Sequence, residues 1–184
     1  MRFNHVHLLV TASAQPNLSA LMKGLGQRYV QYVNRTYHRT GTLWEGRFRS
    51  CLVEAETYFF ACQRYVELNP VRAGMVPDPA AYPWSSFTAN AGAQPDPAIT
   101  PHPLYLALGP TPAKRATAYQ ALFTEALDPA WVDSLRACTS GGFVLGSDRF
   151  QRQVAALLGR RTWKGSPGRP EKQVADPAQQ ALPL

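Results

Sequence analysis

The sequence predicts an α+β fold, and three features of its first half support this class. Residues 3–10 form a short β-favouring run, Phe-Asn-His-Val-His-Leu-Leu-Val, in which one face can be apolar. Residues 18–37 and 54–69 instead repeat their apolar side chains at three- and four-residue spacing, as amphipathic helices do. With 184 residues, the chain is long enough for one domain in which a sheet packs on helices.

The run at residues 3–10 also carries two histidines one residue apart. Successive side chains of a strand point to opposite faces, so His5 and His7 share one face while Val6, Leu8 and Val10 share the other. Imidazole is a common ligand of divalent ions, and two on one strand leave room for further ligands. An ordinary strand with two half-buried histidines explains the same spacing, and both interpretations stay open at this point.

The first predicted helix runs from about residue 18 to 37. A turn at residues 12–16 precedes it, and Asn17 can cap it by accepting a hydrogen bond from a first-turn N–H group. Gly24 and Gly26 each cost about 1 kcal/mol of helix propensity relative to alanine. Their presence predicts that another part of the chain approaches the helix closely.

Residues 43–53 predict a strand or hairpin arm, and a second helix follows from about residue 54. We expect this helix to end at Asn69, because Pro70 has no N–H group with which to continue it. Residues 71–87 then close the unit, with Trp84 and Phe87 as predicted lids on the core.

The chain divides into four predicted regions. Residues 1–89 form the core, and residues 90–103, which contain four prolines and Gly92, form a linker. Residues 104–158 predict a small all-helical appendage with helices near 113–126, 129–137 and 147–158. Residues 159–184 are basic and low in complexity, which predicts a disordered tail.

Charge indicates an anionic partner. The formal net charge is +7, and the excess of Lys and Arg lies in residues 1–90 and 159–184. Arginines alternate with aromatic residues in the first half, a pattern typical of proteins that contact phosphates and stack bases of single strands. The residues expected to contact DNA are Arg28, Arg35, Trp44, Arg47, Arg49 and Arg72.

Other compositional features exclude some classes of protein. No apolar run approaches the ~20 residues of a membrane helix, and no signal peptide is apparent, so we expect a cytoplasmic, nucleoid-associated protein. The three cysteines form no CxxC or Cys/His pattern, and we expect thiols rather than disulfides or structural zinc.

Tyr65 and Asn69 lie four residues apart on the second helix and so share one face. If this face covers the histidines, a phenol, an amide oxygen and two imidazoles converge. Such a set suits phosphodiester transesterification, with tyrosine as nucleophile and a metal as Lewis acid. Taken singly, Tyr65 is better explained as a core aromatic, and Asn69 is better explained as a helix-terminal residue before proline.

Three stretches in this order make the sequence resemble a known family. They are Asn-His-Val-His-Leu-Leu at 4–9, Gly-Thr-Leu-Trp-Glu-Gly-Arg-Phe at 41–48, and Arg-Tyr-Val-Glu-Leu-Asn-Pro-Val-Arg-Ala-Gly at 64–74, followed by Tyr-Pro-Trp-Ser-Ser at 82–86. The resemblance is to the HUH single-tyrosine transposases, specifically the REP-associated tyrosine transposases. It covers residues 1–87, and Leu-Gly-Ser at 145–147 with Phe150 is similar to the C-terminal region of the same branch.

This resemblance implies a site and an activity. His5 and His7 match the metal-binding pair, Tyr65 matches the nucleophile, and Asn69 stands where relatives place a third metal ligand. The family cleaves and rejoins single-stranded DNA, often at the foot of a hairpin, with Mg²⁺ or Mn²⁺ and through a covalent 5′-phosphotyrosine. The resemblance also implies a ferredoxin-like antiparallel sheet packed on helices.

In relatives, a further strand, helix and strand precede the histidine strand, whereas Met1 lies four residues before His5. The expectation is therefore an N-terminally truncated member with an exposed sheet edge. Two other functions fit the residues. One is a domesticated, non-catalytic protein that binds single-stranded or hairpin DNA, and the other is a metal-dependent hydrolase that uses the histidines with Glu67 or Glu45 and forms no protein–DNA adduct.

Overall fold

The structure, a computed structural model, describes residues 5–11 and 18–165. The predicted turn at 12–16, the Asn17 cap and the tail from residue 166 lie outside the described residues. The elements are, in chain order, α1 (Leu18–Thr36), β1 (Leu52–Val53), α2 (Ala55–Arg72), the 3₁₀ helix η1 (Pro79–Ala81), α3 (Phe87–Asn90), α4 (Pro103–Leu106), α5 (Pro112–Ala121), α6 (Pro129–Gly141), β2 (Val144–Leu145) and α7 (Asp148–Leu158).

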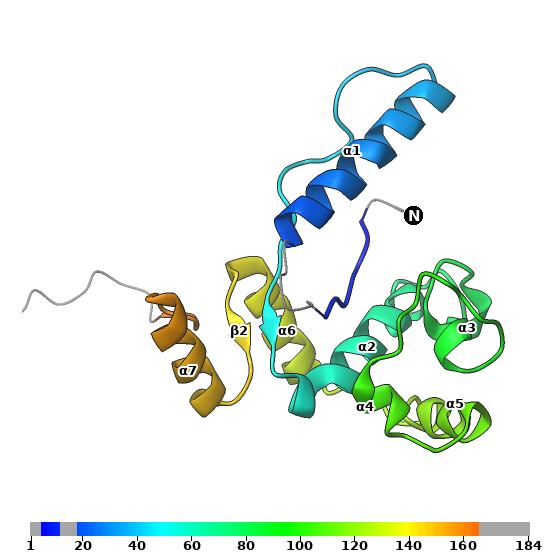
Figure 1. The fold of residues 1–184 in the computed structure, drawn as a ribbon, viewed down its shortest axis with the longest axis vertical. Coiled ribbons are helices and arrows are strands. Elements are labelled where there is room, and N and C mark those ends of the chain that lie inside the picture. Colours follow the sequence, from blue (N-terminus) through cyan, green and yellow to red (C-terminus); the bar gives the residue numbers. More distant parts are fainter. Residues whose placement is uncertain (1–4, 12–17, 166–184) are drawn as a thin grey trace, which may run out of the picture.

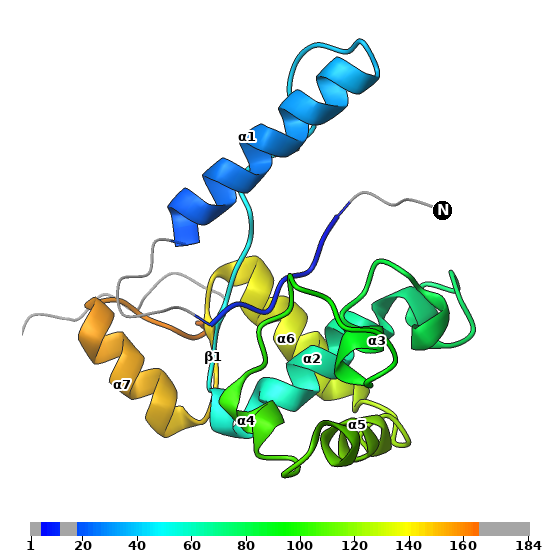
Figure 2. The same ribbon diagram turned by 45° about the vertical axis from the view of Figure 1, so that its right-hand side comes forward.

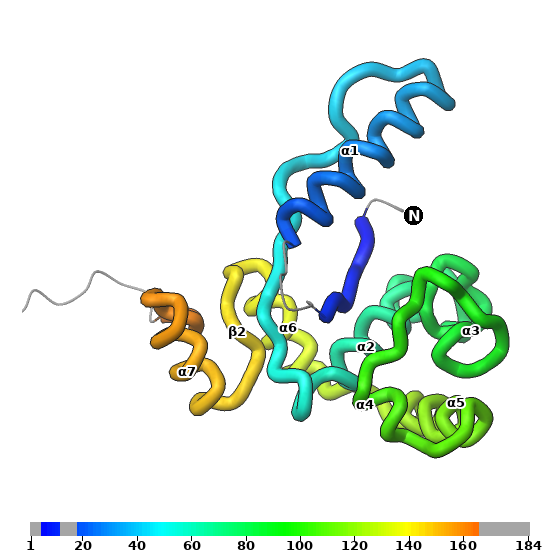
Figure 3. The backbone as a smooth tube through the Cα atoms, in the orientation of Figure 1, coloured from blue at the N-terminus to red at the C-terminus, as the bar shows by residue number. Residues whose placement is uncertain are grey.

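Helix α2 is central to the arrangement. In Figures 1 and 2, α4 lies near the start of α2, α3 and α5 lie farther along it, and α6 runs beside it. The tube in Figure 3 shows α1 and the loop that follows it extending away from the other helices. The segment at residues 5–11 passes between α1 and α2 (Figure 1).

Two apolar clusters hold these elements together. The first joins Cys62 and Tyr65 of α2 to Val132 and Leu135 of α6 and to Leu145 of β2. The second is built from aromatic and small side chains of α3 and α5, with Phe87, Ala91 and Tyr119 at its centre. Because both clusters include residues beyond 100, the C-terminal region contributes directly to the core around α2.

The sheet differs from the one expected. It consists of β1 and β2 in parallel register, with Leu52 opposite Val144 and Val53 opposite Leu145. The expected ferredoxin-like antiparallel sheet is therefore not found among the described residues, although the mixture of helices with a small sheet agrees with the α+β class. The C-terminal region is also not all-helical, because it supplies β2.

Glu54 fastens this pair at its end. Its backbone N–H donates to the Leu145 carbonyl at 2.9 Å, and its carboxylate accepts hydrogen bonds from the Ser147 N–H at 2.7 Å and the Ser147 hydroxyl at 3.1 Å. Ser147 in turn caps α7. The start of α2 and the start of α7 are thus held together.

The predicted histidine strand is wrong for the residues that are described. Residues 5–11 have no regular secondary structure, and Val6, Leu8 and Val10 are exposed rather than packed on α1. A strand is stable only when its backbone groups pair with a neighbour. No described strand pairs with residues 5–11, so this segment does not form a strand despite its alternating apolar and polar residues.

The predicted helix ranges agree with the structure more closely than the predicted strand does. Helices α1, α5, α6 and α7 lie close to the predicted ranges. The second helix, however, continues past Pro70 to Arg72. Proline removes only its own N–H from the ladder, and the neighbouring bond from Ala73 N–H to the Asn69 carbonyl, at 2.9 Å, remains. Burial of the Pro70 ring accompanies this continuation.

Three smaller expectations are also settled here. Phe87 is buried as predicted, but Trp84 is 83% exposed and covers no core. The three cysteines are free thiols, of which Cys62 is buried. Among the described helices, none is both long and apolar enough to cross a membrane.

Candidate active site

Tyr65 lies where three parts of the chain meet. Its position in α2 turns it toward α6 and β2, and only 9% of its surface is exposed. Val132 and Leu135 of α6 pack in the same cluster. This packing restricts the orientation of the phenol, as a nucleophile held for one trajectory requires.

The two histidines reach this tyrosine. The His5 and His7 rings are 4.9 Å apart in an edge-on arrangement, and the His7 ring lies 5.7 Å from the Tyr65 ring, also edge-on. Residues 58 positions apart in the sequence are therefore neighbours. The predicted convergence of the histidine pair with Tyr65 is found, although a strand does not present the pair.

Two arginines flank the same phenol. The Arg72 guanidinium lies over the Tyr65 ring, 5.3 Å from its centre. The side chain of Tyr65 also raises the pKa of Arg136, on α6, above its usual value. Arg72 was predicted to contact DNA, whereas Arg136 was not singled out, because no motif surrounds it and only folding brings it to Tyr65.

The residues present are compatible with a metal site at the histidine pair. Partial desolvation lowers the pKa of His7, and the charge of His5 lowers it further, which favours the neutral imidazole that can bind a metal. Over residues 5–11 and 18–165, no three His, Cys, Asp or Glu side chains gather into a metal-binding group. A third protein ligand would therefore have to be another type of residue, such as the amide of Asn69, one turn after Tyr65 and half-buried.

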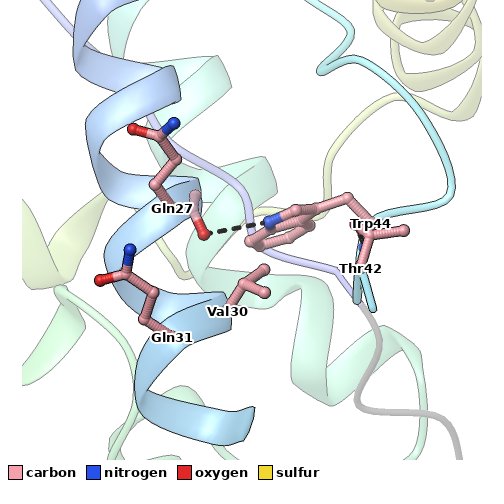
Figure 4. A pocket seen from close by; sticks show the side chains of 6 residues that line it. Gln27, Val30, Gln31, Thr42 and Trp44 are labelled. Atoms are coloured by element: carbon pink, nitrogen blue, oxygen red, sulfur yellow. Dashed lines mark hydrogen bonds between the residues drawn. The ribbon is translucent and has the colours of Figure 1, made fainter. Parts of the chain in front are cut away.

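Trp44 packs on α1 rather than on the core. Its indole N–H donates to the Gly26 carbonyl at 3.3 Å, and its ring lies 5.9 Å from the Tyr29 ring. Figure 4 shows this ring beside Val30, in an open pocket of about 310 Å³ that Gln27, Gln31 and Thr42 also line. A Cβ atom added at Gly26 would lie 3.2 Å from the Trp44 indole nitrogen, so the predicted close approach of another part of the chain is found at Gly26. A Cβ atom added at Gly24 would meet nothing within 4 Å, so the prediction is wrong for Gly24.

The other residues predicted to contact DNA are on the surface. Their side chains could reach a nucleic acid, since each is exposed. Exposure is compatible with phosphate binding and does not by itself assign it. These residues are Arg28 and Arg35 on α1 and Arg47 and Arg49 on the loop before β1.

Glu67 does not join the histidines. It is fully buried on the side of α2 that packs on α3 and α5, where its carboxyl group accepts hydrogen bonds from Ser86, Asn90 and Tyr119. Glu45 is exposed on the loop after α1. Neither carboxylate forms a metal group with the histidines over the described ranges, so the arrangement predicted for a hydrolase is wrong.

Comparison with known proteins finds one family that matches part of the chain. The model of the family described as "Transposase IS200 like" matches residues 1–69, a range that contains the histidine pair, Tyr65 and Asn69. This part of the chain is therefore similar to that family. No match was found among curated proteins or among solved structures.

Proposed function

We propose that the protein is a tyrosine transposase of the REP-associated branch that cleaves and rejoins single-stranded DNA, and that Tyr65 is its nucleophile. The observation that carries the proposal is the contact between the His7 and Tyr65 rings at 5.7 Å. The family match over residues 1–69 and the three sequence stretches that resemble this branch support the same activity.

In the proposed reaction, the Tyr65 oxygen forms a bond to the scissile phosphorus and loses its proton to solvent. The bond between phosphorus and the 3′ oxygen breaks, and this oxygen takes up a proton as the 3′-hydroxyl of the upstream strand. The downstream strand stays attached through a 5′-phosphotyrosine. Rejoining is the reverse attack by a 3′-hydroxyl, so no energy source beyond the phosphodiester is needed.

His5, His7 and Asn69 would hold Mg²⁺ or Mn²⁺, which supplies Lewis-acid polarisation of the phosphate when bound. The protein's own residues fix the phenol. Packing of Tyr65 against α6 and Arg72 over its ring face restrict its rotation. Arg72 also places a positive charge where a phosphate would arrive.

The test uses hairpin oligonucleotides with randomised single-stranded flanks, labelled at the 3′ end. With Mn²⁺, the full chain should form a labelled covalent adduct that survives denaturing electrophoresis, and Tyr65→Phe should abolish it. Tyr58→Phe, on the same helix, is the matched control and should keep the adduct. A labelled peptide mapping to Tyr58 or Tyr32 would contradict the assignment of the nucleophile.

The second candidate, a non-catalytic protein that binds hairpin or single-stranded DNA, is favoured by the exposed arginines at 28, 35, 47 and 49. It predicts retention of the labelled hairpins without a covalent adduct from the wild-type chain. The same experiment therefore separates the two functions.

A further inference from the structure

The pocket between α1 and the loop that follows it is held in shape by hydrogen bonds. The Asn34 side chain donates to the Gly41 carbonyl at 2.9 Å, and this bond holds the loop against the end of the helix. The Trp44 backbone N–H donates to the Thr42 hydroxyl at 3.0 Å, and its indole N–H donates to the Gly26 carbonyl at 3.3 Å. The loop and the indole are therefore fixed on α1 before any ligand binds.

The pocket lies outside the core. No residue of α1 is buried, and Figure 3 shows this helix and its loop extending away from the other helices. Trp44 keeps 40% of its surface exposed, and the neighbouring Tyr29 keeps 51%. An aromatic side chain that stabilises a core is covered by other side chains. The Trp44 ring is instead fixed in place and still accessible to a ligand.

The size and lining of the pocket fit a nucleobase. Its volume is about 310 Å³, whereas an apolar cavity of about 150 Å³ already holds benzene. Val30 and the Trp44 ring supply apolar surface, and Gln27 and Gln31 add amide groups on the α1 side (Figure 4). Both glutamines are exposed. A flat aromatic ring with hydrogen-bonding edges matches this combination.

The charge around the pocket favours an anionic ligand. Residues 18–51 contain five Arg and one Lys against one Glu, and all seven of these residues are exposed. Proteins that bind single strands combine such cations, which contact phosphates, with aromatic rings on which bases stack. A nucleic acid strand meets both requirements, because it carries a base and a negative charge on every nucleotide.

We propose that this pocket binds one unpaired base of single-stranded DNA, which stacks on the Trp44 ring while Gln27 and Gln31 hydrogen-bond its edge. The inference rests on the proposed function, because it takes single-stranded DNA as the substrate. An amide presents a donor and an acceptor side by side and so matches the N6 and N7 edge of adenine, which is the base expected. No residue of α1 belongs to the cluster around Tyr65. The pocket therefore positions the strand and takes no part in cleavage.

The experiment measures binding alone, by fluorescence anisotropy of labelled DNA strands of about 12 nucleotides without metal. One strand carries a single adenine at its centre and abasic sites elsewhere, and a second strand is abasic throughout, so both have the same phosphates. The wild-type full chain should bind the adenine strand about 5- to 100-fold more tightly, the range for stacking of one base. Trp44→Leu should remove this difference and keep the affinity for the abasic strand within about 3-fold, because phosphate contacts determine that affinity.

Trp84→Leu is the matched control. Trp84 is 83% exposed and does not line the pocket, so its replacement should keep the preference for the adenine strand. Gln27→Ala combined with Gln31→Ala changes exposed side chains and leaves the hydrogen bonds of Trp44 in place. This double variant should bind strands with a central adenine, thymine or cytosine about equally, and all of them more tightly than the abasic strand, since stacking remains.

Several results would overturn the inference. Equal binding of the adenine and abasic strands by the wild-type chain is one, and an adenine preference that Trp44→Leu retains as fully as Trp84→Leu is another. Loss of affinity for both strands in Trp44→Leu would show that Trp44 only holds the loop. An unchanged adenine preference in the double glutamine variant would contradict the hydrogen bonds to the base edge. An RNA form of the adenine strand that binds more than about 10-fold tighter would make RNA the occupant.

These outcomes are separate from those that test the proposed function. A chain that shows the adenine preference but forms no adduct at Tyr65 would refute the proposed nucleophile and leave the pocket as a base-binding site. A chain that forms the adduct but binds both strands equally would refute the base-binding pocket and leave the proposed function intact.

Discussion

The buried carboxyl group of Glu67 offers the sharpest test of how α2 is held. Ser86 and Asn90 donate to one of its oxygens at 2.6 and 2.8 Å, and the Tyr119 hydroxyl donates to the other at 2.6 Å. Glu67 and Tyr119 are both fully buried. These bonds connect α2 to α3 and α5, so removing the carboxyl group leaves several donors without acceptors in the interior.

The size of the effect follows from these contacts. Glu67→Ala leaves a cavity and orphans buried donors, which should lower the free energy of unfolding by about 3–5 kcal/mol. Glu67→Gln keeps one acceptor oxygen but turns the other atom into a donor facing Tyr119, a loss of about 1–2 kcal/mol. For a chain of this length, each kcal/mol lowers Tm by about 2–4 °C. The expected decreases are therefore about 6–20 °C for alanine and about 2–8 °C for glutamine.

The pH dependence has a defined sign. Desolvation raises the pKa of Glu67 above its usual range, although the hydrogen bonds from its neighbours oppose this. The folded state therefore binds its proton more tightly than the unfolded state does. The contribution of Glu67 to stability is fully present below the unfolded pKa of about 4.3 and is lost as pH rises through the folded pKa. The Tm advantage of the wild type over Glu67→Gln should shrink as pH rises.

Thermal unfolding followed by circular dichroism at several pH values measures both effects. Glu56→Gln is the control, because Glu56 is exposed in the first turn of the same helix and should change Tm little. If Glu67→Ala melts within about 2 °C of the wild type, the carboxyl group does not hold α2 to α3 and α5. A Tm advantage that grows with pH would contradict the raised pKa.

Three further predictions concern α1, the histidines and the exposed arginines. Gly24→Ala should stabilise α1 by up to about 1 kcal/mol, since its Cβ meets no atom, whereas Gly26→Ala should stabilise it less because its Cβ would press on the Trp44 indole. Helix content and Trp fluorescence, followed during heating, compare the two variants. Equal stabilisation by both would contradict the packing of Trp44 on Gly26. Replacing either His5 or His7 with alanine should weaken metal-dependent cleavage while DNA affinity stays within a few fold, and parallel losses would indicate a folding role instead. If Arg47 and Arg49 each neutralise one phosphate, replacing either with Gln should reduce the slope of log affinity against log salt concentration by about 0.7 for single-stranded DNA. An unchanged slope would show that the replaced arginine does not contact the phosphates.

Sequence reasoning was most successful where the signal is local. The ranges of α1, α5, α6 and α7 follow from helical periodicity, because this pattern depends on residues three or four apart. The sequence also predicted that Tyr65 meets the histidines if its face of the second helix covers them, and the His7 ring does lie 5.7 Å from the Tyr65 ring.

The main errors in the sheet involve partners distant in sequence. Alternation at residues 5–10 predicts a strand, but whether a strand forms depends on a neighbour that the pattern does not contain. Pairing of Leu52 with Val144 likewise joins segments with no shared motif. Trp84, a large aromatic in an expected lid, is exposed because side-chain type alone does not determine burial.

The parallel pairing of β1 with β2 has a consequence for the order in which the molecule assembles. Leu52, just before α2, pairs with Val144, 92 positions later. Ribosomes add about 5–20 residues each second, so roughly 5–18 s separate synthesis of the two strands. For most of this interval α6 has not been made either, so Tyr65 lacks the Val132, Leu135 and Leu145 side chains that pack around it. The surroundings of Tyr65 are thus completed only when nearly the whole described chain has been translated.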